Sequence, residues 1–141
     1  MSLVEPGASG ATLAPAPSTR WWRFSGEALV WAVLLLGVEV LIATLGAPYP
    51  LLRGFVGDLL AVVWVYFVFR TVLAAPACLL ALAAFGVGCA VEVGQYLAAA
   101  NGWKLSSPVL RIVLGSVADW WDVLAYAIGF VLIMAGRMMR R

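Results

Sequence analysis

Residues 74–100 read AAPACLLALAAFGVGCAVEVGQYLAAA, an apolar stretch long enough to cross a bilayer as one helix. Glu92 and Gln95 stand near its end, three residues apart, so both side chains lie on one face of that helix. An ionisable group is costly inside a bilayer and usually turns toward the protein interior. This face is therefore the first place to look for function.

The whole chain has the composition of a polytopic membrane protein. Hydrophobic residues make up 65% of its 141 residues and charged residues 11%, whereas a soluble domain carries about 25% charged residues. The net charge of +2 is too small to indicate nucleic-acid binding. The sequence has no histidine, which removes His-based triads and His-ligated metal sites. We predict no cofactor, no metal site and no catalytic residue.

Three further apolar runs have similar lengths, and together the four predict an all-α fold of transmembrane helices. The first run is expected to be an uncleaved span and not a signal peptide. The predicted spans cover residues 27–46, 54–72, 75–98 and 120–136. Residues 1–19 are expected to form a disordered cytoplasmic tail, and residues 20–141 the membrane domain. Within the loop 99–119, a short apolar segment is predicted to lie on the interface or to enter it as a re-entrant segment.

The basic residues predict the orientation of these spans. If both termini are cytoplasmic, six basic residues lie inside, namely Arg20, Arg23, Arg70, Arg137, Arg140 and Arg141. Three lie outside, namely Arg53, Lys104 and Arg111. This excess favours cytoplasmic termini. We predict a multi-pass protein of a bacterial cytoplasmic (inner) membrane.

That orientation brings the unusual polar side chains to the extracytoplasmic side. We predict one polar pocket at the ends of three spans, formed by Asp58, Glu92, Gln95, Asp122 and Tyr126. Lys104 and Arg111 are its expected counter-charges, and Glu39 is an intramembrane carboxylate deeper in the first span.

Each acid of this pocket also has a local explanation. Asp58 and Asp122 can be acids favoured at helix N-termini, and Glu92 can form a structural pair with a loop cation. Glu39 can be a protonated packing residue. Small residues at intervals of four are expected to be helix-packing faces: Gly86, Ala90 and Gly94 on the third span, and Ala125 and Gly129 on the fourth.

Several segments resemble the small bacterial membrane proteins of the domain of unknown function 2809 family. They are Gly57-Asp58-Leu59-Leu60, Glu92-Val93-Gly94-Gln95, Leu114-Gly115 and the run DVLAYAIG at 122–129. The resemblance implies that the family pattern is matched at Asp58, Glu92, Gln95, Asp122, Tyr126 and Gly129. Arg111 fits the arginine that often precedes the Leu-Gly pair, whereas Ala118 stands where an aromatic residue is common. The order of acids is also distantly similar to VanZ-like proteins, which are associated with tolerance to teicoplanin-type glycopeptides, although their histidine is missing.

The resembled family has no established activity, so three functions stay open. The first is a non-enzymatic envelope protein whose pocket binds a lipid head group or envelope precursor, or docks a partner. The second is a small transporter or flippase component, oligomeric, with Glu39, Glu92 and Asp58 as a proton or cation relay. The third is an enzyme that uses Asp58 with Asp122 or Glu92 as acid and base on a lipid-linked substrate. Expected partners are the bilayer and a second copy or another membrane protein, without nucleic acid.

Overall fold

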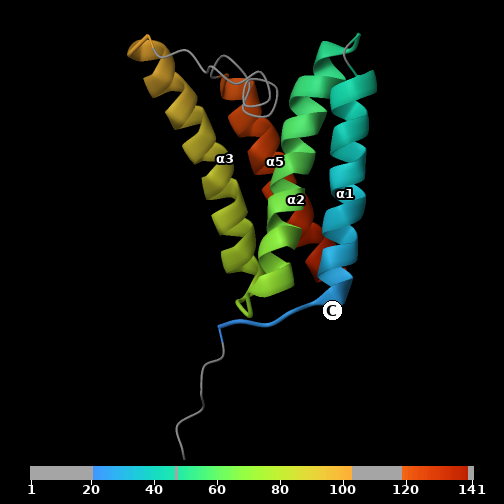
Figure 1. Cartoon of the computed structure of the whole chain (residues 1–141). Helices are drawn as coiled ribbons and strands as arrows, with labels where there is room; N and C mark the ends of the chain where they lie inside the picture. Colours follow the sequence, from blue (N-terminus) through green and yellow to red (C-terminus); the bar gives the residue numbers. More distant parts are fainter. Residues whose placement is uncertain (1–20, 47, 103–118, 140–141) are drawn as a thin grey trace, which may run out of the picture.

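The computed structural model describes residues 21–46, 48–102 and 119–139, and nearly all of them are helical. The helices are α1 (Gly26–Leu45), the π-helical turn η1 (Leu52–Val56), α2 (Gly57–Val72), α3 (Ala77–Ala100) and α5 (Trp120–Met138) (Figure 1). Because η1 continues directly into α2, the two form one span. The predicted all-α fold is therefore confirmed.

Four spans are long and apolar enough to cross a membrane. Their observed bounds, Gly26–Leu45, Leu52–Val72, Ala77–Ala100 and Trp120–Met138, differ from the predicted ranges by at most two residues at either end. The chain is a multi-pass membrane protein. The expected tail 1–19 and the expected re-entrant segment, which falls within 103–118, lie outside the described residues.

Successive spans run in opposite directions, which gives the bundle two different ends (Figure 1). The lower end carries the first residues of α1 and α3 and the last residues of α2 and α5, and the upper end carries their opposite ends. Local signals start the helices: the Ser25 side chain accepts the Ala28 N–H at 3.4 Å, and α3 begins after Pro76. Both ends of the described chain therefore lie on one side of the bundle.

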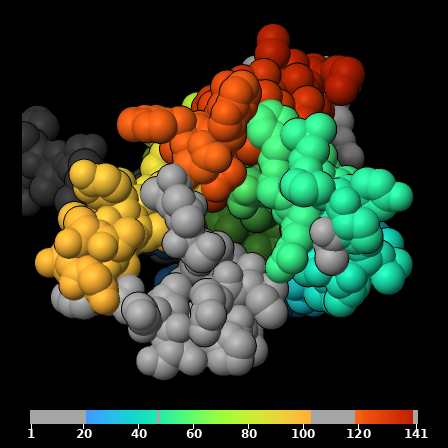
Figure 2. All heavy atoms as spheres, turned by 90° about the horizontal axis from the view of Figure 1, so that it is seen from above, coloured from blue at the N-terminus to red at the C-terminus, as the bar shows by residue number. Residues whose placement is uncertain are grey.

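Helix α2 holds the bundle together because it contacts α1, α3 and α5, and α3 and α5 also contact each other. Seen from the upper end, α1 and α3 lie on opposite sides, with α2 and α5 between them (Figure 2). The core consists of side chains from α2, α3 and α5: Val62, Tyr66, Ala77, Leu80, Ala81, Ala84, Tyr126 and Ile133. Alanines on the inner face of α3 allow its neighbours to approach closely.

Helices α5 and α2 approach each other closely at Gly129. A Cβ atom at Gly129 would lie 2.8 Å from the Leu59 carbonyl oxygen and 3.4 Å from Val62 Cβ. Since a backbone atom cannot move aside easily, a larger residue does not fit there. Ala125, one turn earlier, is fully buried. These two small residues of α5 thus lie where their spacing predicted a packing face.

The small-residue stripe predicted on α3 makes no close contact with the described part of the chain. Ala90 is exposed, and a Cβ atom at Gly86 or Gly94 would meet no described atom within 4 Å. Gly88 packs instead, because a Cβ there would lie 2.8 Å from Cδ2 of the Tyr126 ring. The outer face of a membrane helix is as apolar as its inner face, so small residues alone do not reveal which face turns inward. Packing of this stripe against another molecule stays a prediction.

Candidate functional site

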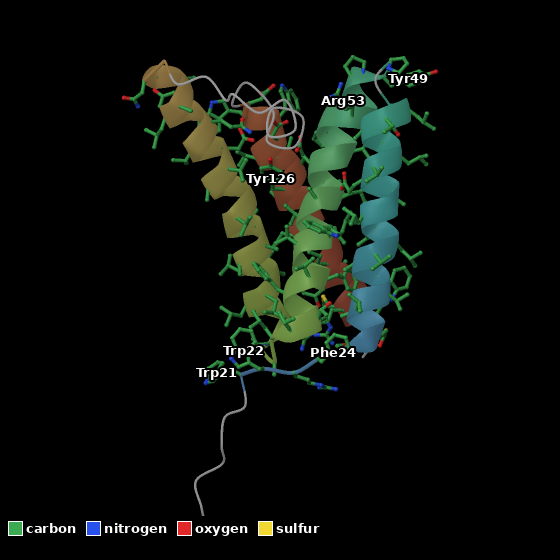
Figure 3. All side chains as sticks on the ribbon, viewed as in Figure 1. Trp21, Trp22, Phe24, Tyr49, Arg53 and Tyr126 are labelled. Atoms are coloured by element: carbon green, nitrogen blue, oxygen red, sulfur yellow. The ribbon has the colours of Figure 1, made fainter. Side chains whose placement is uncertain are left out.

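Polar side chains from three helices meet at the upper end of the bundle. Asp58 lies in the first turn of α2, Asp122 in the first turn of α5, and Tyr126 one turn further along α5 (Figure 3). Glu92 lies on the inner face of α3 and is 6% exposed, so it is buried among these groups. We call Asp58, Glu92, Asp122 and Tyr126 the polar cluster.

The Tyr126 hydroxyl stands at the centre of the polar cluster. Its oxygen lies 3.1 Å from Glu92 Oε1 and 3.5 Å from Asp58 Oδ1. A hydroxyl has one proton to donate, so the shorter contact to Glu92 is the stronger bond. Because both carboxylate oxygens lie so near one hydroxyl, they are no more than about 7 Å apart. The tyrosine therefore links carboxyl groups of α2 and α3 from its place on α5.

Asp58 and Asp122 form a second link between α2 and α5. Their side chains lie within hydrogen-bonding reach of each other. Two carboxyl groups can form such a bond only when one of them carries a proton, since an ionised carboxylate only accepts. A proton carried by either acid could therefore be shared between the two.

Glu92 also joins α3 to the beginning of α5. Its Oε2 accepts the backbone N–H of Asp119 at 3.1 Å, and Asp119 Oδ1 in turn accepts the Trp121 N–H at 3.1 Å. A negative charge is favourable there because the helix dipole is positive at its N-terminus. The described partners of Glu92 are thus neutral donors. The counter-charges predicted for it, Lys104 and Arg111, lie outside the described residues.

Glu39 extends the polar cluster toward α1. Its Oε2 lies 3.9 Å from the place where a Cβ of Gly57 would be, and Glu39 is close enough to Asp58 for electrostatic repulsion. Its other oxygen, Oε1, is buried and has no hydrogen-bond partner among the described residues. Glu39 thus lies against α2 at Gly57, and acidic groups from all four spans lie near one another.

Gln95 is the predicted pocket residue that the described contacts do not connect to the polar cluster. It is half-buried, and its Oε1 is buried without a hydrogen-bond partner among residues 21–46, 48–102 and 119–139. It lies nearly one turn beyond Glu92 on α3, closer to the upper end.

Sequence reasoning missed three features of this site. Asp119 looked like an ordinary loop acid, but its backbone N–H binds Glu92. Gly88 supports the Tyr126 ring. The π-helical turn η1 directly precedes Gly57 and Asp58, and such turns are frequent at functional sites. The glycines at 54 and 57 are the available local signal for that turn, and they are too common in membrane helices to identify it.

The polar cluster can exchange protons and accept hydrogen bonds. No group of three or more potential ligands that could hold a metal ion occurs within the described part of the chain. The acids are arranged around a tyrosine hydroxyl and backbone N–H groups, which suits a proton, an ammonium group or another donor.

Comparison with known proteins identifies one family. The sequence model of a family described as "Protein of unknown function (DUF2809)" matches residues 49–130. No curated protein and no solved structure matches the chain. The predicted family resemblance is thereby confirmed, while the VanZ-like similarity stays a prediction. The matched range contains the whole polar cluster but not Glu39.

Proposed function

We propose a function for this chain, which belongs to the DUF2809 family of proteins of unknown function, from the chemistry of its polar cluster. The protein is an envelope membrane protein that binds the head group of a lipid or lipid-linked envelope precursor. The head group it binds is positively charged or donates hydrogen bonds. The observation that carries this proposal is the convergence of Asp58 and Glu92 on the Tyr126 hydroxyl.

Depth and charge support this assignment. Asp122 lies in the first turn of its span, Asp58 is the seventh residue of the span Leu52–Val72, and Glu92 lies two turns before the end of its own span. Span ends lie near the head groups of a bilayer, where a lipid can present an ammonium group to buried acids. Desolvated carboxylates are costly unless they are paired, and such a ligand would supply a positive charge.

The side of the membrane on which this binding takes place is also part of the proposal. The excess of basic residues at the chain ends favours cytoplasmic termini. The polar cluster, at the opposite end of the bundle (Figure 1), would then face the outer leaflet of a bacterial cytoplasmic membrane.

The proposal is tested by mass spectrometry of lipids that copurify with the full chain. The probe variant is the double substitution Asp58→Asn and Asp122→Asn, which removes the charges and keeps the side-chain shapes. Glu27→Gln, in the first turn of α1 at the lower end, is the matched control. We expect an amine-bearing lipid to be enriched with the wild type and the control and lost from the double variant. Identical lipid profiles for all three proteins would contradict the proposal.

A second candidate function, a proton or cation relay, is favoured by the position of Glu39. This acid stands next to Gly57 and Asp58, so acids from all four spans form one series across the bundle. Neighbouring acids within membrane spans are typical of proton pathways. Reconstituted vesicles with a pH-sensitive dye distinguish the two functions, since a relay requires proton flux that Glu39→Gln abolishes, whereas a head-group site gives none.

A further inference from the structure

At the lower end of the bundle, an extended segment is hydrogen-bonded to the connection between α2 and α3. Residues 21–25 run antiparallel to residues 71–74, and Trp22 and Leu73 form the bridge between them. The Arg23 N–H donates to the Val72 carbonyl at 3.0 Å, the Ser25 N–H to that of Thr71 at 2.9 Å, and the Ala74 N–H to that of Trp21 at 2.9 Å. We call residues 21–25 and 70–74 the strap surface.

The backbone bonds turn the aromatic side chains of the strap surface outward. Trp21, Trp22 and Phe24 are 62%, 70% and 71% exposed, and they project from the lower end of the bundle (Figure 3). Tryptophan is enriched where a bilayer meets water, because its ring is apolar and its N–H is polar. These side chains therefore belong at head-group depth.

The arginines of the described residues are unevenly distributed between the two ends. Arg23 and Arg70, both on the strap surface, and Arg137 in the last turn of α5 lie at the lower end. Glu27 is the acid described at that end. The described part of the upper end has the opposite balance, with Arg53 against the polar cluster, Asp119 and Glu39. The lower end is thus the positive end.

We propose that the strap surface binds the head groups of anionic phospholipids. Arg23 and Arg70 are exposed, and a guanidinium group matches the geometry of a phosphate with two parallel hydrogen bonds. The aromatic side chains beside them would lie where the head groups of the same lipids meet the acyl chains. Because the backbone pairing already orders this segment, little conformational entropy is lost when a lipid binds.

This inference is independent of the proposed function, since it concerns the other end of the bundle and lipids of the opposite charge. A partner protein with an acidic surface is the competing occupant. Its binding would not depend on the net charge of the phospholipid head group, so the comparison of an anionic with a zwitterionic lipid separates the two.

The test is native mass spectrometry of the full chain in detergent with added phosphatidylglycerol or phosphatidylcholine. The probe variant is the double substitution Arg23→Gln and Arg70→Gln, which leaves every strap backbone N–H in place. Arg53→Gln at the upper end is the control. We expect the wild type and control to retain phosphatidylglycerol over phosphatidylcholine, and the double variant to lose this retention by about fivefold or more. Thermal unfolding of each variant without added lipid confirms that the fold is kept.

Three outcomes would overturn the inference. The first is equal retention of the two lipids by the wild type, which would leave an acidic protein partner as the better occupant. The second is equal loss in the control and the double variant, which would place the lipid elsewhere. The third is displacement of phosphatidylglycerol by the same concentration of inorganic phosphate, which would show that a free anion is enough.

Discussion

Polar side chains turn in opposite directions at the two ends of this bundle. At the upper end, acids turn inward and are joined by side-chain hydrogen bonds around the Tyr126 hydroxyl. At the lower end, aromatic and basic side chains turn outward, and backbone hydrogen bonds hold the segment that carries them. A polar group below the head groups must find its partner inside the protein, whereas one at the surface can find it in water or lipid. The upper end, with its inward acids, is therefore the candidate for selective binding. The lower end, with its outward side chains, is the candidate for contact with the membrane surface.

The largest expected effect concerns which end faces the cytoplasm. We predict that both termini, and therefore the lower end, are cytoplasmic, because the basic residues are concentrated there. A C-terminal alkaline phosphatase fusion should be inactive and a C-terminal fluorescent fusion bright. An active phosphatase would mean that the lower end is extracytoplasmic and that the polar cluster lies on the cytoplasmic side.

The next largest effect should come from the tight contact below the polar cluster. Gly129→Leu would push a side chain into the Leu59 carbonyl, and we expect it to lower the free energy of unfolding by about 2 to 3 kcal/mol. Gly86→Leu is the control, since a Cβ there meets no described atom within 4 Å. Unfolding in increasing dodecyl sulfate measures both. Equal losses would mean that the outer face of α3 is packed in the native assembly.

The hydrogen bonds of the polar cluster should have a smaller effect. Tyr126→Phe removes the hydroxyl that links Glu92 and Asp58, and we expect a loss of about 1 kcal/mol, as is usual for hydrogen bonds between membrane helices. Tyr96→Phe is the matched control, because the Tyr96 side chain, in the upper half of α3, is 66% exposed. The same titration measures this difference. If the two variants have the same stability, the cluster does not hold the upper end together.

The smallest effect is expected at Glu39. Glu39→Gln keeps the shape of a side chain whose Oε1 has no described partner, so the protein should remain in the membrane at wild-type abundance. Quantitative immunoblotting of the membrane fraction measures this. Loss of the protein would instead reveal an essential buried ion pair, because removing one member of such a pair costs about 3 to 5 kcal/mol.

The sequence alone determined the number of spans, their bounds within two residues and the end at which the acids gather. The length of an apolar run is a local property that the bilayer thickness converts directly into a span. Asp58, Glu92 and Asp122 stand toward alternating starts and ends of consecutive spans. Because consecutive spans cross the bilayer in opposite directions, these acids had to reach the same end.

The tertiary structure decided which face of each helix turns inward and which groups pair. Lipid and protein interior are similarly apolar, so the pattern could not show that Gly88 packs and Gly86 does not. Glu92 binds the start of α5, and Trp21 pairs with Ala74, through backbone N–H groups. Every residue except proline offers such a group, so no side-chain pattern marks these partners in advance, and only the folded chain brings them together.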